Sequence, residues 1–158
     1  MRLFVAVELP ETVRRELAGC IEKLSSFGGD VRWVEPKNLH VTLKFLGSVE
    51  ESRLLSIRNE LEKIARRSKP FVARLTSLRG FPRASDPQIV WAGVGEGVEN
   101  LSELAKLTEE SLRDQGFQTE DRAFTAHVTL GRARSKKIWK KSHRPFKKIC
   151  PSVVMRLR

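Results

Sequence analysis

The chain has 158 residues, of which 40% are hydrophobic and 31% are charged. This size and this balance exclude a disordered chain and provide enough apolar side chains for the core of one domain or of two small lobes. Lys and Arg number 30 against 19 Asp and Glu, which gives a formal net charge of +11. The expected partners are therefore polyanions, with nucleic acid first.

Targeting signals and metal-type cysteine spacing are not found in the sequence. No apolar run approaches membrane-spanning length, and the start MRLFVAVELPE is charged too early for a signal peptide. Cys20 and Cys150 are far apart, and we expect both to be reduced thiols. We therefore expect a cytoplasmic protein with no membrane contact, and a monomer is the expected state.

The first quarter of the chain predicts a strand, a helix and two further strands. Residues 3–9 form an apolar run that is typical of a buried strand. Pro10 closes this strand and suits the first turn of a helix. Residues 31–34 and 39–46 are expected to be extended. The helix that begins at Pro10 has apolar residues at helical spacing, so one of its faces should pack on a sheet: Val13, Leu17, Ile21 and Leu24.

A second helix is predicted over residues 54–67. Ser48 followed by Glu51 resembles a capping box that would begin it. Residues 71–78 and 88–94 are then expected to be strands, separated by a basic loop that contains Gly and Pro.

A third helix is predicted over residues 98–112 and should stop at Gly116, before a strand at 126–131. This order of elements predicts an α+β protein with helices on the outer faces of a sheet. We expect residues 1–134 to form a two-lobed domain, which a basic segment over 135–158 completes or extends. Basic and aromatic side chains that suit RNA gather in and just before that segment: Arg132, Arg134, Lys136, Lys137, Trp139, Lys140, Lys141, Arg144, Phe146, Lys147 and Lys148.

One tetrapeptide, HVTL, occurs twice, beginning at His40 and at His127. The two copies lie more than half of the chain length apart and use two of the three histidines. Val, Thr and Leu favour an extended strand, in which successive side chains point to opposite faces. Each copy should therefore place its histidine and its threonine, Thr42 or Thr129, on one face.

Two facing imidazoles suit general acid–base catalysis. With an unperturbed pKa near 6.5, one can be protonated and the other neutral near neutral pH. In-line displacement at phosphorus needs such a pair, and the threonine hydroxyls could donate to the phosphoryl oxygens. A single histidine in a strand is more often structural, but two copies of one motif favour the catalytic interpretation.

The segments WVEPKNLHVTLKFLG (33–47) and FTAHVTLGRAR (124–134) resemble the paired HxTx motifs of the two-histidine (2H) phosphoesterases. The similarity is closest to the RNA 2',3'-cyclic phosphodiesterases, historically called 2'-5' RNA ligases, and extends from residue 2 to about residue 134. It implies a bilobal α+β fold with two antiparallel sheets and outer helices around a central cleft, and a pseudo-two-fold repeat. The family has a Tyr near its C-terminus, whereas this chain has none, and residues 151–154 are expected to supply a shortened last strand.

The resemblance also implies an activity, a substrate and residue roles. The activity is hydrolysis, without metal or cofactor, of RNA 2',3'-cyclic phosphate ends to 2'-phosphates, with tRNA fragments among the candidate substrates. His40 would be the proton donor to the leaving oxygen, and His127 the acceptor that activates water. Thr42, Thr129 and Arg132 would hold the phosphoryl oxygens.

Three other interpretations remain open at this point. The protein could be a basic RNA-binding module with structural histidines, which would bind RNA without turnover. It could join 2'-5' RNA ends, although no GxxxxGK nucleotide-binding loop is present. A metal enzyme is disfavoured, because two histidines are too few ligands and neither motif contains a carboxylate or thiol.

Overall fold

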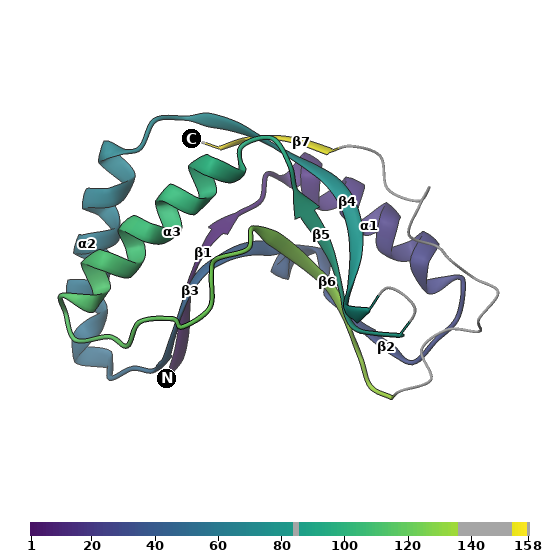
Figure 1. The fold of residues 1–158 in the computed structure, drawn as a ribbon, viewed down its shortest axis with the longest axis horizontal. Coiled ribbons are helices and arrows are strands. Elements are labelled where there is room, and N and C mark those ends of the chain that lie inside the picture. Colours follow the sequence, from purple (N-terminus) through teal and green to yellow (C-terminus); the bar gives the residue numbers. More distant parts are fainter. Residues whose placement is uncertain (84–85, 136–152, 158) are drawn as a thin grey trace.

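The structure is a computed structural model, which describes residues 1–83, 86–135 and 153–157. Within these residues, seven strands and three α-helices make up an α+β fold (Figure 1). In chain order the elements are β1 (Arg2–Glu8), α1 (Glu11–Ser25), β2 (Val31–Trp33), the 3-10 turn η1 (Pro36–Asn38), β3 (His40–Ser48), η2 (Glu51–Arg53), α2 (Leu54–Arg67), β4 (Phe71–Arg83), β5 (Asp86–Val94), α3 (Val98–Arg113), β6 (His127–Ala133) and β7 (Val153–Leu157).

The strands form one antiparallel sheet in the order β1-β3-β6-β5-β4-β7, and β2 also pairs with β6. The junction between β3 and β6 is narrow, since a single residue pair, Val41 with Val128, joins them. The two sheets expected from the family resemblance are therefore two halves of one sheet, connected at this pair. Both strands of the junction are HVTL strands, so the motifs lie side by side at its centre.

The two halves repeat one structural irregularity. Where β1 pairs with β3, Leu43 is an extra residue in the ladder, because Ala6 pairs with Thr42 and Val5 pairs with Lys44. Where β5 pairs with β6, Leu130 is the extra residue in the same way. A β-bulge of this kind shifts the alternation of side chains beyond it by one position. The fourth residue of each HVTL is thus a bulge, which supports an internal duplication that sequence identity outside the motif does not reveal.

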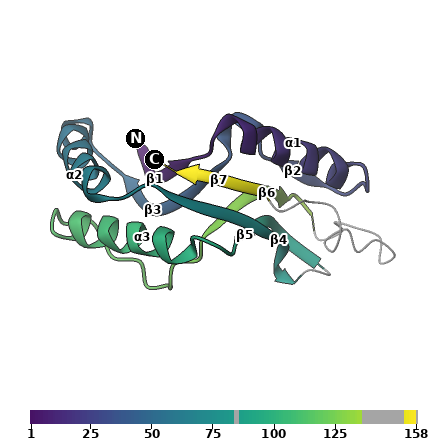
Figure 2. The same cartoon turned by 90° about the horizontal axis from the view of Figure 1, so that it is seen from above.

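Helices α1 and α2 pack in different cores, and α3 contributes to both, with Leu101 in the first and Leu112 in the second. Helix α1 packs its apolar face, including Val13 and Leu17, into a core that contains Val41, Val128 and side chains of β4–β7. Helices α2 and α3 contribute Ile57 and Leu112 to a second, smaller core beside β1. Figures 1 and 2 show α1 at one end of the molecule and α2 and α3 together at the other. Among the described residues, no helix is long and apolar enough to cross a membrane.

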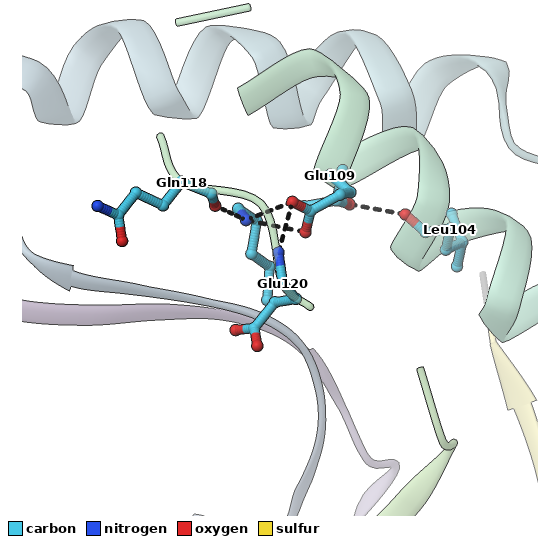
Figure 3. Close-up of polar contacts among 6 residues, drawn as sticks. Leu104, Glu109, Gln118 and Glu120 are labelled. Carbon is cyan, nitrogen blue, oxygen red and sulfur yellow. Dashed lines mark hydrogen bonds and ion pairs between the residues drawn. The ribbon is translucent and has the colours of Figure 1, made fainter. Parts of the chain in front are cut away.

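A buried ion pair connects β3 to α3, and backbone groups of the segment after α3 join the same network (Figure 3). The Lys44 side chain is fully buried, and its Nζ donates to both carboxylate oxygens of Glu109 at 2.8 Å and to the carbonyl oxygen of Gln118 at 2.6 Å. Glu109 also accepts a hydrogen bond from the backbone N–H of Glu120 at 3.2 Å. Lys44 directly follows the bulge of the first motif. The network therefore links the first motif to the segment between α3 and β6, which leads to the second motif.

Several sequence-based expectations differ from the structure. The predicted basic loop at 79–87 is mostly strand, because β4 runs to Arg83, β5 begins at Asp86, and their backbones pair along this length. The capping box is absent, since neither η2 nor α2 has a side-chain cap. Cys20 is buried and disulfide-bonded, so the reduced thiol expected there is wrong, whereas Cys150 lies outside the described residues.

The C-terminal strand is paired within the sheet. β7 pairs antiparallel with β4, from Val153 opposite Leu75 to Leu157 opposite Phe71. The expected last strand therefore exists, but it covers residues 153–157 instead of 151–154. The basic stretch over 136–152 lies outside the described residues.

Candidate active site

The two HVTL motifs place four polar side chains on one face of the sheet. Val41 and Val128 are fully buried on the opposite face, so alternation directs His40, Thr42, His127 and Thr129 away from the core. All four are half-buried and accessible to solvent. We call this the histidine face. The structure thus brings together the four motif residues that the sequence predicted.

The pairing of Val41 with Val128 fixes how these four side chains are arranged. In an antiparallel pair with this register, His40 lies beside Thr129 and Thr42 lies beside His127. The two histidines are then diagonal neighbours, which regular pairing separates by roughly 7–8 Å. A phosphoryl group between them could meet an imidazole on each side and a hydroxyl at each remaining corner.

Both imidazoles are held in the same orientation by the same backbone contact. Nδ1 of His40 lies 2.6 Å from the carbonyl oxygen of Asn38, and Nδ1 of His127 lies 2.7 Å from that of Thr125. A carbonyl oxygen only accepts, so each Nδ1 carries the hydrogen and donates it. Within the described residues, no group is hydrogen-bonded to Nε2 of either ring, so Nε2 can accept or donate a proton toward a substrate.

Arg132 lies on the histidine face because of the β-bulge. Strict alternation from His127 would put Arg132, five positions later, on the core face. The extra residue Leu130 reverses this, so that Gly131 pairs with buried Val90 and Arg132 pairs with Ile89. The exposed Arg132 side chain thus lies on the same face as the motif residues.

Aromatic rings on the histidine face were not predicted from the sequence. The ring of Phe4 stacks on His40 with 4.8 Å between centroids, and it lies 6.2 Å from the ring of Phe45. Phe4 and Phe45 are 48% and 62% exposed, which is unusual for side chains of this size. Trp91 meets His127 edge-on at 5.3 Å. Phe45 could not be found by alternation, since only the bulge at Leu43 brings it to this face.

No other described feature competes with this face as a catalytic centre. A cavity of about 370 Å³ lies on α2 and contains none of the predicted residues; its lining is Ser56, Asn59, Glu60, Glu62, Lys63, Arg66 and Gln115. Over the parts of the chain that the structure describes, no group of three or more His, Cys, Asp or Glu side chains could hold a metal ion.

Comparison with known proteins gives a consistent result. The model of the LigT-like phosphoesterase family matches residues 7–91, which include the first motif. The RNA 2',3'-cyclic phosphodiesterase of Archaeoglobus fulgidus is 40% identical over 136 residues, which cover 86% of this chain and 74% of that protein. The protein of the same name from Thermotoga maritima is 36% identical over 140 residues, covering 85% and 71%.

Solved structures share the fold. A protein from Thermus thermophilus superposes with a TM-score of 0.79 at 29% identity, covering 99% of this chain and 84% of its own. E. coli LigT complexed with 3'-AMP superposes with a TM-score of 0.74 at 25% identity, covering 98% and 83%. Family model, relatives and the paired motifs on one face agree: the chain belongs to the LigT-like phosphoesterase family.

Proposed function

We propose that this protein hydrolyses 2',3'-cyclic phosphate ends of RNA to 2'-phosphates, without a metal ion. The observation that carries the proposal is the pair of histidines, each with Nδ1 bonded to a backbone carbonyl and Nε2 free, on one solvent-accessible face. Relatives up to 40% identical bear the name RNA 2',3'-cyclic phosphodiesterase, which supports both the hydrolase activity and this substrate.

In the proposed reaction the two imidazoles act on opposite sides of the phosphorus. Nε2 of His127 takes a proton from water as the water oxygen bonds to phosphorus. The bond from phosphorus to the ribose O3' breaks, and Nε2 of His40 gives its proton to that oxygen. The 2'-phosphate remains on the ribose, and proton exchange with solvent returns His40 and His127 to their starting states.

Donors around the phosphoryl group stabilise the charge that develops there. The hydroxyls of Thr42 and Thr129 lie at the two corners between the histidines and can donate to the non-bridging oxygens. The guanidinium of Arg132 offers two parallel N–H groups to the same oxygens. Donors that are positioned before the reaction lower its barrier, because they need not reorganise as the charge forms.

The exposed aromatic rings support a nucleotide substrate and the direction of the reaction. Phe4 and Phe45 present faces on which a nucleobase could stack. Phe4 also stacks on His40, so a base held there would bring its ribose toward His40. The leaving O3' would then face His40, which supports His40 as the acid and leaves the side of His127 to water.

Hydrolysis is favoured over joining of RNA ends, because the half-buried histidines and threonines are open to solvent and water is the abundant nucleophile there. E. coli LigT has been crystallised with phosphate and with 3'-AMP, which supports a phosphate- and nucleotide-binding face in the family.

The test is turnover of a short RNA with a 2',3'-cyclic phosphate end, in the presence of EDTA. The wild type should yield only a 2'-phosphate, and His40→Ala and His127→Ala should show no measurable turnover. His143→Ala, which changes the third histidine, is the matched control and should retain activity. Binding of RNA without turnover by the wild type would instead favour the non-catalytic RNA-binding module. Loss of activity in EDTA would contradict the metal-free reaction.

A further inference from the structure

Two arginines lie directly opposite each other at one end of the histidine face. In the antiparallel pair of β2 and β6, Arg32 is in register with Arg132. Residues in register project from the same face, with Cβ atoms roughly 4.5–5.5 Å apart. Arg32, which the sequence analysis did not single out, therefore stands beside the proposed phosphoryl-binding arginine.

This arrangement is unfavourable without an anion. Like charges that are directly opposite on a sheet destabilise it. Within the described residues, neither Arg32 nor Arg132 forms an ion pair, although the Glu35 carboxylate lies near enough to Arg32 to interact electrostatically. Glu35 itself is paired at 2.9 Å with Lys37, whose hydrogen bond lowers the pKa of that carboxyl.

Arginines on the outer surface of the helices are arranged differently. Four of them form ion pairs with glutamates one turn away: Arg14 and Arg15 with Glu11, and Arg58 and Arg66 with Glu62. The exposed guanidinium groups of Arg32 and Arg132 differ from these four, because within the described residues no carboxylate forms an ion pair with either.

The positive surface continues past this pair. Just after β6 ends at Ala133, the backbone N–H of Arg134 donates to the carbonyl oxygen of Asp30 at 2.8 Å. The Arg134 side chain is also exposed. Arg32 on β2, Arg132 on β6 and Arg134 just after β6 are close along the paired strands, and we call them the arginine surface.

In the proposed reaction the phosphoryl group needs no further arginine. Its two non-bridging oxygens would each receive a threonine hydroxyl, from Thr42 or Thr129, and one N–H group of Arg132. The Arg32 guanidinium is left for another anion close by. The chemical group that stands next to a terminal cyclic phosphate in an RNA strand is the preceding phosphodiester, which carries one negative charge.

We propose that Arg32, on the arginine surface, binds the phosphodiester adjacent to the terminal cyclic phosphate. This inference rests on the proposed function and narrows its substrate to an RNA strand, because a cyclic mononucleotide has no such phosphodiester. Arg32 is a specificity-determining residue: it binds substrate and takes no part in the proton transfers.

The test compares a cyclic mononucleotide with a dinucleotide that ends in a 2',3'-cyclic phosphate. Arg32→Ala should lower kcat/KM for the dinucleotide by about tenfold, the size expected for one charge-assisted hydrogen-bonded contact, and mainly through KM. Arg32→Ala should leave kcat/KM for the cyclic mononucleotide unchanged. With longer RNA it should also reduce the slope of log affinity against log salt by about one. Arg58→Ala removes an exposed arginine on α2, which pairs with Glu62, and should change none of these values.

A modified substrate tests the contact itself. A dinucleotide with an uncharged methylphosphonate in place of its phosphodiester should be a poorer substrate for the wild type by the same factor. For Arg32→Ala, kcat/KM should be the same with the methylphosphonate as with the phosphodiester. Equal losses on the mononucleotide and the dinucleotide would overturn the proposal and place Arg32 at the reacting phosphoryl group, and no loss on either would overturn it as well.

The design separates this proposal from the proposed function. If the wild type turns over neither substrate, the hydrolytic function fails, and the salt dependence of RNA binding still reports on Arg32. If the wild type turns over both and Arg32→Ala behaves like the wild type, the hydrolytic function stands and the second phosphate site fails.

Discussion

Val41 pairs with Val128, and each is the counterpart of the other in the repeated tetrapeptide. When a residue pairs with its own counterpart, the local two-fold axis of the duplicated structure passes between the two residues. The four polar side chains of the motifs are therefore arranged symmetrically about this pair, His40 beside Thr129 and Thr42 beside His127. Both valines are fully buried, so the same contact that joins the two halves also directs the polar residues to the other face.

The roles of the two histidines can be separated with a sulfur leaving group. A thiolate is a far weaker base than an alkoxide and leaves without a general acid. On a substrate with sulfur in place of O3', His40→Ala should recover most of the wild-type rate, whereas His127→Ala should remain inactive. Single-turnover kinetics measure this, and recovery in His127→Ala instead would reverse the assignment of acid and base.

The pH dependence of kcat/KM should be bell-shaped. At low pH the base is protonated and cannot accept a proton from water, and at high pH the acid has none to donate. With the sulfur substrate the alkaline limb should disappear, since the acid is no longer needed. A rate that rises steadily with pH on the oxygen substrate would contradict paired acid–base catalysis.

Arg132 should contribute mainly to the rate of the chemical step. Arg132→Ala removes two preorganised donors to the phosphoryl oxygens and should lower kcat by about 10²–10³-fold. Arg132→Lys should recover only part of this, because an ammonium cannot reproduce the bidentate geometry. Steady-state kinetics on a cyclic mononucleotide test it, and an effect confined to KM would show that Arg132 binds substrate and transition state equally.

Phe45 should contribute to binding of the nucleobase. Loss of one base–aromatic stack costs about 1–3 kcal/mol, so Phe45→Ala should raise KM for a cyclic nucleotide with little effect on kcat. Leu55→Ala is the control, since Leu55 is an equally exposed apolar residue on α2, at 69%. Equal effects of the two variants would mean that Phe45 acts through stability alone.

The buried Lys44–Glu109 pair should matter more for stability than any surface pair. Lys44→Met leaves the Glu109 carboxylate and the Gln118 carbonyl without their buried partner and should cost about 3–5 kcal/mol of unfolding free energy. Lys63→Met, which breaks the exposed pair with Glu60, should cost under about 1 kcal/mol. Urea unfolding measures both, and similar values for the two variants would contradict a structural role for the Lys44 network.

The motifs, most of the elements and the faces of the strand residues that precede each bulge follow from the sequence alone. Hydrophobic periodicity placed α1, α2 and α3 because helices of this length are stabilised by one apolar face. Alternation put His40 with Thr42 and His127 with Thr129, because strand side chains repeat every two residues. The repeat of HVTL, with its resemblance to paired HxTx motifs, was sufficient to predict the family.

The tertiary structure decided what depends on pairing between distant strands. Register placed Arg32 beside Arg132 and joined the motifs at Val41 and Val128, and no local pattern encodes which residues of two strands face each other. The bulges at Leu43 and Leu130 moved Phe45 and Arg132 to the histidine face. A bulge depends on the packing of both strands, so alternation read from one strand assigns the residues beyond it to the wrong side.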